Sequence, residues 1–174
     1  GHNVANLRAG VIGLNLGRSH ARAYAACEGF DLVALCDIVP ERLAERADEL
    51  DVSGRYADYV EMLDAERLDV VSVATTQALH AEMTITAASR GVQAIICEKA
   101  MANSMGEAEA MLAACDRNGV KLAIGHQGRH LPAFEKARDL VTSGAIGRPL
   151  IVSVSVEEGG LMNQGSHLLD RIIY

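Results

Sequence analysis

The sequence predicts an α/β fold: a doubly wound parallel sheet followed by the start of an α+β domain with a mostly antiparallel sheet. Short apolar segments alternate with helix-forming segments from residue 7 to residue 125, and these apolar segments lack a polar face, as strands covered by helices on both sides do. Valine and serine then alternate over residues 152–156, which indicates a strand with one buried face. We therefore expect one domain over residues 1–125 and an incomplete second domain over 126–174.

Composition excludes several classes of protein. With 174 residues, 49% hydrophobic and 22% charged, the chain can bury one core and begin a second. A net charge of -7 without a basic run argues against a nucleic-acid or anionic-membrane partner, and no apolar run reaches membrane-spanning length. The cysteines lack C-x-x-C spacing, so we expect them to be reduced and buried, which favours the cytoplasm. They are Cys27, Cys36, Cys97 and Cys115.

The first predicted strand, residues 8–12, runs into the turn Gly13-Leu-Asn-Leu-Gly17 and a helix over residues 17–27. Glycines there would let an anion approach the backbone, and a helix start offers unpaired amides and the positive end of its dipole. Asn15 replaces the second glycine of the dinucleotide pattern G-x-G-x-x-G, but asparagine tolerates a left-handed backbone. A strand-to-helix turn without a ligand is the alternative.

The second predicted strand, residues 31–36, ends at Asp37, 24 positions after Gly13. A carboxylate at this position can accept hydrogen bonds from a ribose diol and repels a 2′-phosphate, which favours NAD over NADP. As an alternative, Asp37 only caps the turn before Pro40, where a helix to about residue 50 begins.

The next predicted elements continue the alternation of strand and helix. They are an extended piece at 55–56, helices over 59–65, 79–90 and about 104–118, and strands over 68–74, 92–97 and 121–125. Polar side chains follow the strand ends, namely Asn15, Asp37, Thr75, Lys99 and Gln127. Because the carboxyl ends of parallel strands meet at one edge, these residues predict a single ligand crevice.

The second predicted domain contains a helix over residues 134–143, a strand over 150–157 and a final helix. On this last helix a polar face is formed by Asn163, His167, Asp170 and Tyr174. Such a row is either a chemical cluster or a solvated face. His126 and His130 lie four positions apart, but Pro132 interrupts the helix and no third ligand is evident, so we expect no metal site.

Several segments taken together resemble one family. They are the Gly13 turn with Arg18-Ser-His20, the strand-end Asp37, Val73-Ala-Thr-Thr76 with His80, Glu98-Lys99-Ala100, and the Gly- and His-containing segment 159–170. This combination resembles the Gfo/Idh/MocA oxidoreductases, the glucose-fructose oxidoreductase and inositol dehydrogenase group. The resemblance implies a Rossmann domain that binds NAD, or less readily NADP. It also implies a second domain that holds a sugar, inositol or related polyol and assembles homo-oligomers through its sheet.

The resemblance also implies roles for individual residues. Lys99 matches the lysine of the family's Glu-Lys-Pro motif and would act as acid and base, since desolvation lowers the pKa of an ammonium. His167 matches the histidine that contacts the reacting hydroxyl and would relay the proton, while Asn163 would orient a substrate hydroxyl. A surface ion pair between Lys99 and Glu98 is the alternative. The expected cofactor-binding residues are Gly13, Asn15, Leu16, Gly17, Asp37, Ile38, Arg42, Thr75, Thr76, His80, Glu98, Lys99 and Gln127.

The sequence departs from the family in three ways. Ala100 stands where the family has proline after the lysine, and Asn163 stands where many members have aspartate. Residue 158 runs straight into 159 where the family has a long segment, so we expect the chain to be incomplete. Two other functions stay open: a non-catalytic NAD(P)-binding sensor, and an elimination or cleavage assisted by transient oxidation with a recycled cofactor.

Overall fold

The computed structural model describes residues 5–153 and 165–173. The chain divides into two compact units, Gly1–Ile124 and Gly125–Tyr174. Each unit has its own arrangement of elements.

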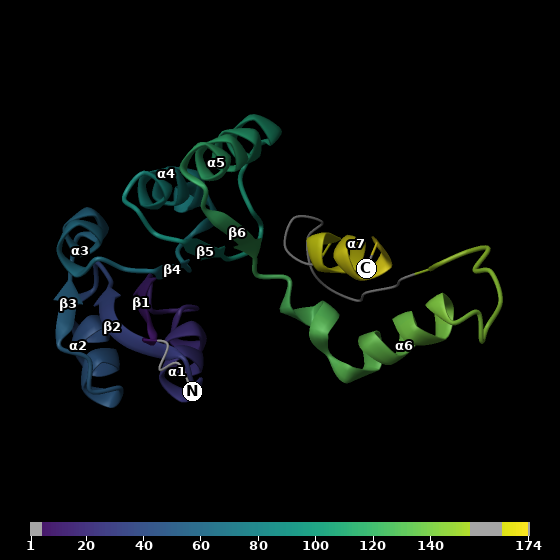
Figure 1. Cartoon of the computed structure of the whole chain (residues 1–174), viewed down its shortest axis with the longest axis horizontal. Helices are drawn as coiled ribbons and strands as arrows, with labels where there is room; N and C mark the ends of the chain where they lie inside the picture. Colours follow the sequence, from purple (N-terminus) through teal and green to yellow (C-terminus); the bar gives the residue numbers. More distant parts are fainter. Residues whose placement is uncertain (1–4, 154–164, 174) are drawn as a thin grey trace. The chain divides into compact units, whose positions relative to one another are not determined.

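The first unit is the predicted doubly wound parallel sheet. Its six strands are β1 (Leu7–Ile12), β2 (Phe30–Cys36), β3 (Gly54–Tyr56), β4 (Val70–Val73), β5 (Ala94–Cys97) and β6 (Lys121–Ile124). They pair in parallel in the order β3-β2-β1-β4-β5-β6 (Figure 1). The helices are α1 (Arg18–Ala26), α2 (Pro40–Glu49), α3 (Tyr59–Glu66), α4 (Gln77–Ala88) and α5 (Met105–Asn118).

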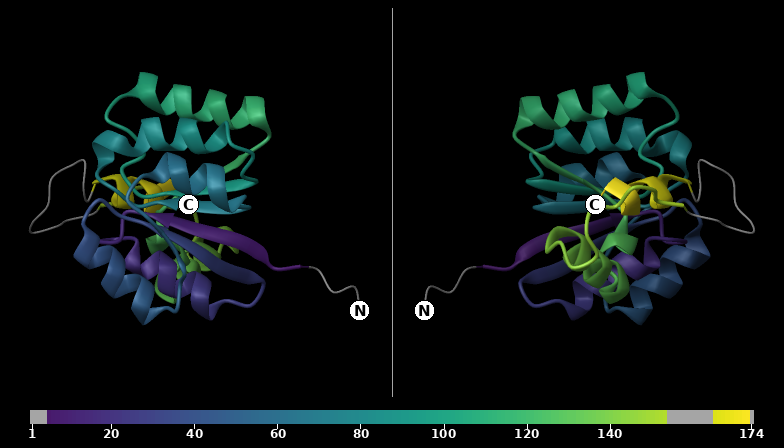
Figure 2. Two further views of the ribbon diagram at one scale, coloured as in Figure 1. Left: turned by 90° about the vertical axis from the view of Figure 1, so that its left-hand side faces the viewer. Right: turned by 90° about the vertical axis from the view of Figure 1, so that its right-hand side faces the viewer.

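The sheet separates two apolar cores, because successive side chains of a strand point to opposite faces. Val11 and Leu35 pack with residues of α1 and α2 on one face. Ile12 and Val71 pack with residues of α3, α4 and α5 on the other face. Figure 2 shows these helices in layers on the two sides of the strands. Burial on both faces explains why the strands read as nearly continuous apolar runs.

The boundaries of some elements differ from the predicted ones, because buried residues can lie outside the hydrogen-bonded part of a strand. Leu68 and Val92 are each only 4% exposed, yet both precede the strands they were expected to begin. An apolar run in the sequence indicates which residues are buried, but it does not indicate at which residue the strand begins to pair with its neighbour. Helix α4 begins at Gln77, two residues before the expected start, and ends at Ala88, two residues before the expected end.

The second unit contains the short 3₁₀ helix η1 (Gln127–His130) and the helices α6 (Pro132–Thr142) and α7 (Ser166–Ile173). The sequence did not predict η1. Residues 150–153 do not form the predicted strand, and Leu150 is 87% exposed; residues 154–157 lie outside the described part of the chain. A strand needs a paired neighbour, and the described residues of this unit contain none. The antiparallel sheet stays a prediction.

Candidate functional site

The candidate cofactor site of the first unit lies where β1 and β4 end. The order of the strands reverses between these neighbours, and ligands of doubly wound sheets bind at such a switch point. Gly13 follows β1 with φ +85°, and a Cβ on it would lie 2.7 Å from the carbonyl oxygen of Ala74 after β4. Only glycine satisfies both the left-handed backbone and this close approach.

The first turn of α1 is open to an anion. Its N-cap is Gly17, no side chain caps it, and no acidic residue lies in the first turn. A Cβ on Gly17 would collide with the carbonyl oxygen of Gly13, so the turn and the helix start pack without side chains between them. Asn15 and Leu16 of the same turn are exposed. Uncapped amides and the helix dipole suit a pyrophosphate group.

The Asp37 carboxylate at the end of β2 is buried and held by three neighbours. Oδ2 accepts from the Leu14 amide at 2.8 Å, and Oδ1 accepts from the Val39 amide at 2.9 Å. Arg42 Nη1 donates to both oxygens at 3.1 and 3.2 Å. Asp37 therefore does cap the turn before α2, as the alternative reading held, and it also stands at the edge that a ribose would reach. The neighbouring Ile38 is 85% exposed.

Glu98, at the end of β5, is 7% exposed, so its carboxylate does not lie at the surface. Oε1 lies 3.0 Å from His20 Nε2, and Oε2 accepts from the Lys99 amide at 3.2 Å. The hydrogen bond from His20 is the main cause that lowers the pKa of Glu98. The other ring nitrogen of His20 lies 3.0 Å from the Ser72 hydroxyl, which also bonds to Tyr24. Lys99 is half-buried, and its positive charge is a smaller cause that lowers the pKa of Glu98; the surface ion pair of these two residues stays a prediction.

Elementary chemistry fixes the direction of the hydrogen bond at the Glu98 end of this chain. An ionised carboxylate only accepts, so His20 donates from Nε2 to Glu98. In the sequence His20 stands out only as part of a motif, Tyr24 only as one residue of a helix face, and Ser72 not at all. Their spacing carries no local signal, because they come from α1 and β4.

The loops after β4 and β5 are braced by His80. Its ring is 1% exposed, with Nδ1 2.9 Å from the Ala100 carbonyl and Nε2 3.3 Å from the Thr75 carbonyl. The ring therefore faces backbone, whereas Thr75 is half-buried and Thr76 is exposed. The peptide bond between Lys99 and Ala100 is cis.

In the second unit, α7 and η1 are joined by an ion pair. Arg129 donates to both carboxylate oxygens of Asp170, with Nε 3.0 Å from Oδ2. This bond is the main cause that lowers the pKa of Asp170, whose side chain is 11% exposed. No local pattern in the sequence points to Arg129 or to its pairing with Asp170. Gln127, predicted as a cofactor residue, begins η1.

Two histidines adjoin this ion pair. His126 Nδ1 is 4.0 Å from Asp170 Oδ1, and the rings of His126 and His167 meet edge to face with centroids 5.3 Å apart. Leu169 and Ile173 of α7 are exposed instead. His167 and Asp170 thus pack within the unit, and for these two residues the solvated-face alternative is wrong. Asn163 and Tyr174, predicted on the same face, lie outside the described residues.

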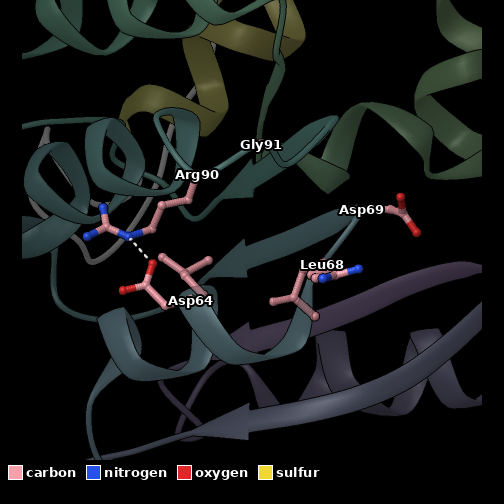
Figure 3. A pocket seen from close by; sticks show the side chains of 7 residues that line it. Asp64, Leu68, Asp69, Arg90 and Gly91 are labelled. Atoms are coloured by element: carbon pink, nitrogen blue, oxygen red, sulfur yellow. Dashed lines mark hydrogen bonds and ion pairs between the residues drawn. The ribbon is translucent and has the colours of Figure 1, made fainter.

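A separate hollow of about 460 Å³ lies at the amino edge of the sheet (Figure 3). It is lined by Leu63, Asp64, Arg67, Leu68, Asp69, Arg90 and Gly91, and Arg90 donates to Asp64 across it at 2.9 Å. It contains none of the predicted site residues.

Further observations concern the cysteines, the helix lengths and the potential metal ligands among the described residues 5–153 and 165–173. Cys36, Cys97 and Cys115 are buried thiols, and burial raises the pKa of Cys36 and of Cys97 to about 12. Cys27 is exposed, contrary to expectation, because it follows the last turn of α1. No helix in this part of the chain is long and apolar enough to span a membrane, and no three potential metal ligands cluster in it.

The chain is similar to known oxidoreductases. Residues 7–126 match the Gfo/Idh/MocA family, described as an oxidoreductase family with an NAD-binding Rossmann fold. A D-apiose dehydrogenase of Paraburkholderia graminis is 37% identical over 169 residues, which are 97% of this chain and 45% of that enzyme.

Two solved structures share the fold. A myo-inositol 2-dehydrogenase from Lactobacillus plantarum is 31% identical with a TM-score of 0.77, over 82% of this chain and 42% of that one. An oxidoreductase from Agrobacterium radiobacter in complex with NAD+, L-tartaric acid and magnesium is 26% identical with a TM-score of 0.86, over 96% of this chain and 54% of that one. The chain spans about half the length of the curated relatives it matches.

Proposed function

The chain belongs to the Gfo/Idh/MocA oxidoreductase family, and from that premise we propose that the protein is an NAD-dependent dehydrogenase. Its substrate is a secondary alcohol of a sugar, an inositol or a related polyol. The observation that carries the proposal is the placement of the Gly13 turn, Asp37 and Lys99, which follow β1, β2 and β5 at the carboxyl edge of one parallel sheet.

The residues at this edge fit an adenine dinucleotide. The uncapped start of α1 suits its pyrophosphate, and the buried carboxylate of Asp37 suits its ribose diol. When bound, NAD supplies the hydride acceptor for oxidation of the alcohol carbon. The exposed Ile38 offers an apolar surface beside Asp37 for the adenine. A carboxylate at this position also favours NAD over NADP.

The chain's own residues handle the proton. Lys99, in its neutral form, accepts the hydroxyl proton on Nζ during oxidation and returns it in the reverse reaction. Glu98 accepts from the Lys99 amide and thereby holds the backbone from which this side chain extends. His167 of the second unit relays the proton, and Asn163 orients a substrate hydroxyl.

The test mixes the protein with NAD and a panel of inositols, D-apiose and other polyols, and follows NADH absorbance. We expect turnover with at least one alcohol, and we expect Lys99→Ala to lose at least about two orders of magnitude in kcat, in line with general acid–base catalysis. Lys121→Ala is the matched control, since Lys121 starts β6 at the opposite edge of the same sheet. NAD binding without turnover of any polyol would favour the sensor instead.

The proposal includes a homo-oligomer assembled through the second unit, in the cytoplasm. The buried thiols of Cys36, Cys97 and Cys115, which form no disulfide, support this compartment. Light scattering on the eluting peak of a sizing column measures the oligomeric state directly, and a monomeric mass would contradict the assembly.

A further inference from the structure

We infer that Arg42 competes with the cofactor's ribose for Asp37 and thereby sets how strongly the protein prefers NAD to NADP. This inference rests on the proposed function, because it requires the Asp37 edge to bind an adenine dinucleotide. It concerns a residue that touches the cofactor-binding carboxylate.

The acceptor capacity of Asp37 is already used. A carboxylate offers about four lone-pair positions. Two of them are taken by the amides of Leu14 and Val39, and Arg42 Nη1 contacts both oxygens as well. The side chain of Asp37 is only 3% exposed, so it cannot turn to present fresh acceptors. A ribose diol brings two hydroxyl donors, and one existing donor must leave before both can bond.

Arg42 is the donor that can leave. The amide of Leu14 belongs to the turn that is fixed by the hydrogen bond from the Gly13 amide to Cys36, and the amide of Val39 belongs to the residue that starts α2. The hydrogen bonds from these two backbone amides to Asp37 measure 2.8 and 2.9 Å, whereas the two contacts of Arg42 Nη1 with Asp37 measure 3.1 and 3.2 Å. The Arg42 side chain is 36% exposed on a flexible stem.

The same contact changes the charge that a 2′-phosphate would meet. With the guanidinium on it, Asp37 forms a neutral pair and repels a phosphate less than a lone carboxylate does. Once displaced, Arg42 stays tethered five residues from Asp37 in the first turn of α2. A guanidinium there suits a phosphate, which it binds with paired donors. Arg42 therefore disfavours NAD and favours NADP relative to a chain without it.

The experiment measures the Kd of NAD and of NADP by calorimetry for the wild type, Arg42→Ala and Arg42→Lys. We expect Arg42→Ala to bind NAD about two- to fivefold more tightly, because a partly exposed ion pair is worth about 1 kcal/mol or less. We expect NADP to bind more weakly by a similar factor, so that the Kd of NADP divided by the Kd of NAD rises about tenfold. Arg42→Lys keeps the positive charge, so its ratio of the two Kd values should lie between the ratios of the wild type and of Arg42→Ala.

Arg55→Ala is the matched control. Arg55 lies on the neighbouring strand β3 with a side chain 40% exposed, and it bonds to Asp48 and to the Val52 carbonyl instead of to Asp37. This variant should leave the ratio unchanged. Weaker NAD binding by Arg42→Ala, or an unchanged ratio, overturns the inference while the proposed function stands. A wild type that binds neither nucleotide removes the proposed function itself.

Discussion

The carboxylate of Glu98 lies 3.0 Å from the imidazole of His20, although the two residues are 78 positions apart in the chain. The contact joins the end of β5 to the first turn of α1, and it is nearly closed to solvent, with side chains 9% and 16% exposed. Glu98 in turn holds the backbone amide of Lys99. The backbone position of Lys99, the candidate catalytic residue, therefore depends on a hydrogen bond between β5 and α1, and the sequence alone does not show that these two elements meet.

Breaking this pair should cost more than the bond itself, because the remaining partner stays buried and unsatisfied. We expect His20→Asn and Glu98→Gln each to lower the free energy of unfolding by about 1–3 kcal/mol. Urea unfolding of both single variants and the double variant measures the coupling, which should be about 0.5–3 kcal/mol for a direct contact. Additive effects would mean that the two side chains act independently.

The contribution of Glu98 to the stability of the fold should depend on pH in the acid range. Its folded-state pKa lies below the unfolded value of about 4.3, so its ionised form stabilises the fold above that pH. This stabilisation is lost as the pH falls from about 4.3 through the folded-state pKa. The Tm difference between wild type and Glu98→Gln should therefore be large near pH 7 and shrink toward about pH 3. A gap of constant size across this range would rule out the titration of Glu98 as its source.

Gly13→Ala should damage the cofactor edge by two separate effects. The left-handed backbone costs about 1 kcal/mol for any side chain, and the clash with the Ala74 carbonyl adds about 1–3 kcal/mol by overpacking. Gly91→Ala is the control, because Gly91 has φ +80° and nothing within 4 Å of the added Cβ. We expect Gly13→Ala alone to lose NAD binding in calorimetry and to show the larger fall in Tm. Equal effects in both variants would show that the close approach to β4 is not important.

Asp170→Asn should impair catalysis without weakening NAD binding. It removes the charge that ties α7, and with it His167, to Arg129 of η1. We expect kcat/KM to fall by about tenfold or more while the Kd of NAD stays within about twofold, because His167, which we propose as the proton relay, would be misplaced. Asp139→Asn, whose carboxylate is 62% exposed beside Arg138, should behave as wild type. An unchanged kcat/KM in Asp170→Asn would place His167 outside the reaction.

Local sequence determined the architecture of the first unit. The alternation of apolar runs and helical segments depends on residues close together in the chain, so it predicted the parallel sheet and placed Asp37 and Lys99 after strand ends. The prediction of a strand over residues 150–153 was wrong. Alternation of valine and serine indicates a half-buried strand only where a neighbouring strand is present to pair with it.

The partners of the polar side chains were decided by tertiary structure alone. Periodicity indicates which residues are buried, but a hydrogen-bond partner depends on which elements the sheet order brings side by side. The sequence therefore could not show that His20 reaches Glu98, that Leu14 and Arg42 fill the acceptors of Asp37, or that Asp170 turns inward to Arg129. Each of these contacts joins separate segments of the chain across a turn or between elements, and only the folded backbone sets the distance between them.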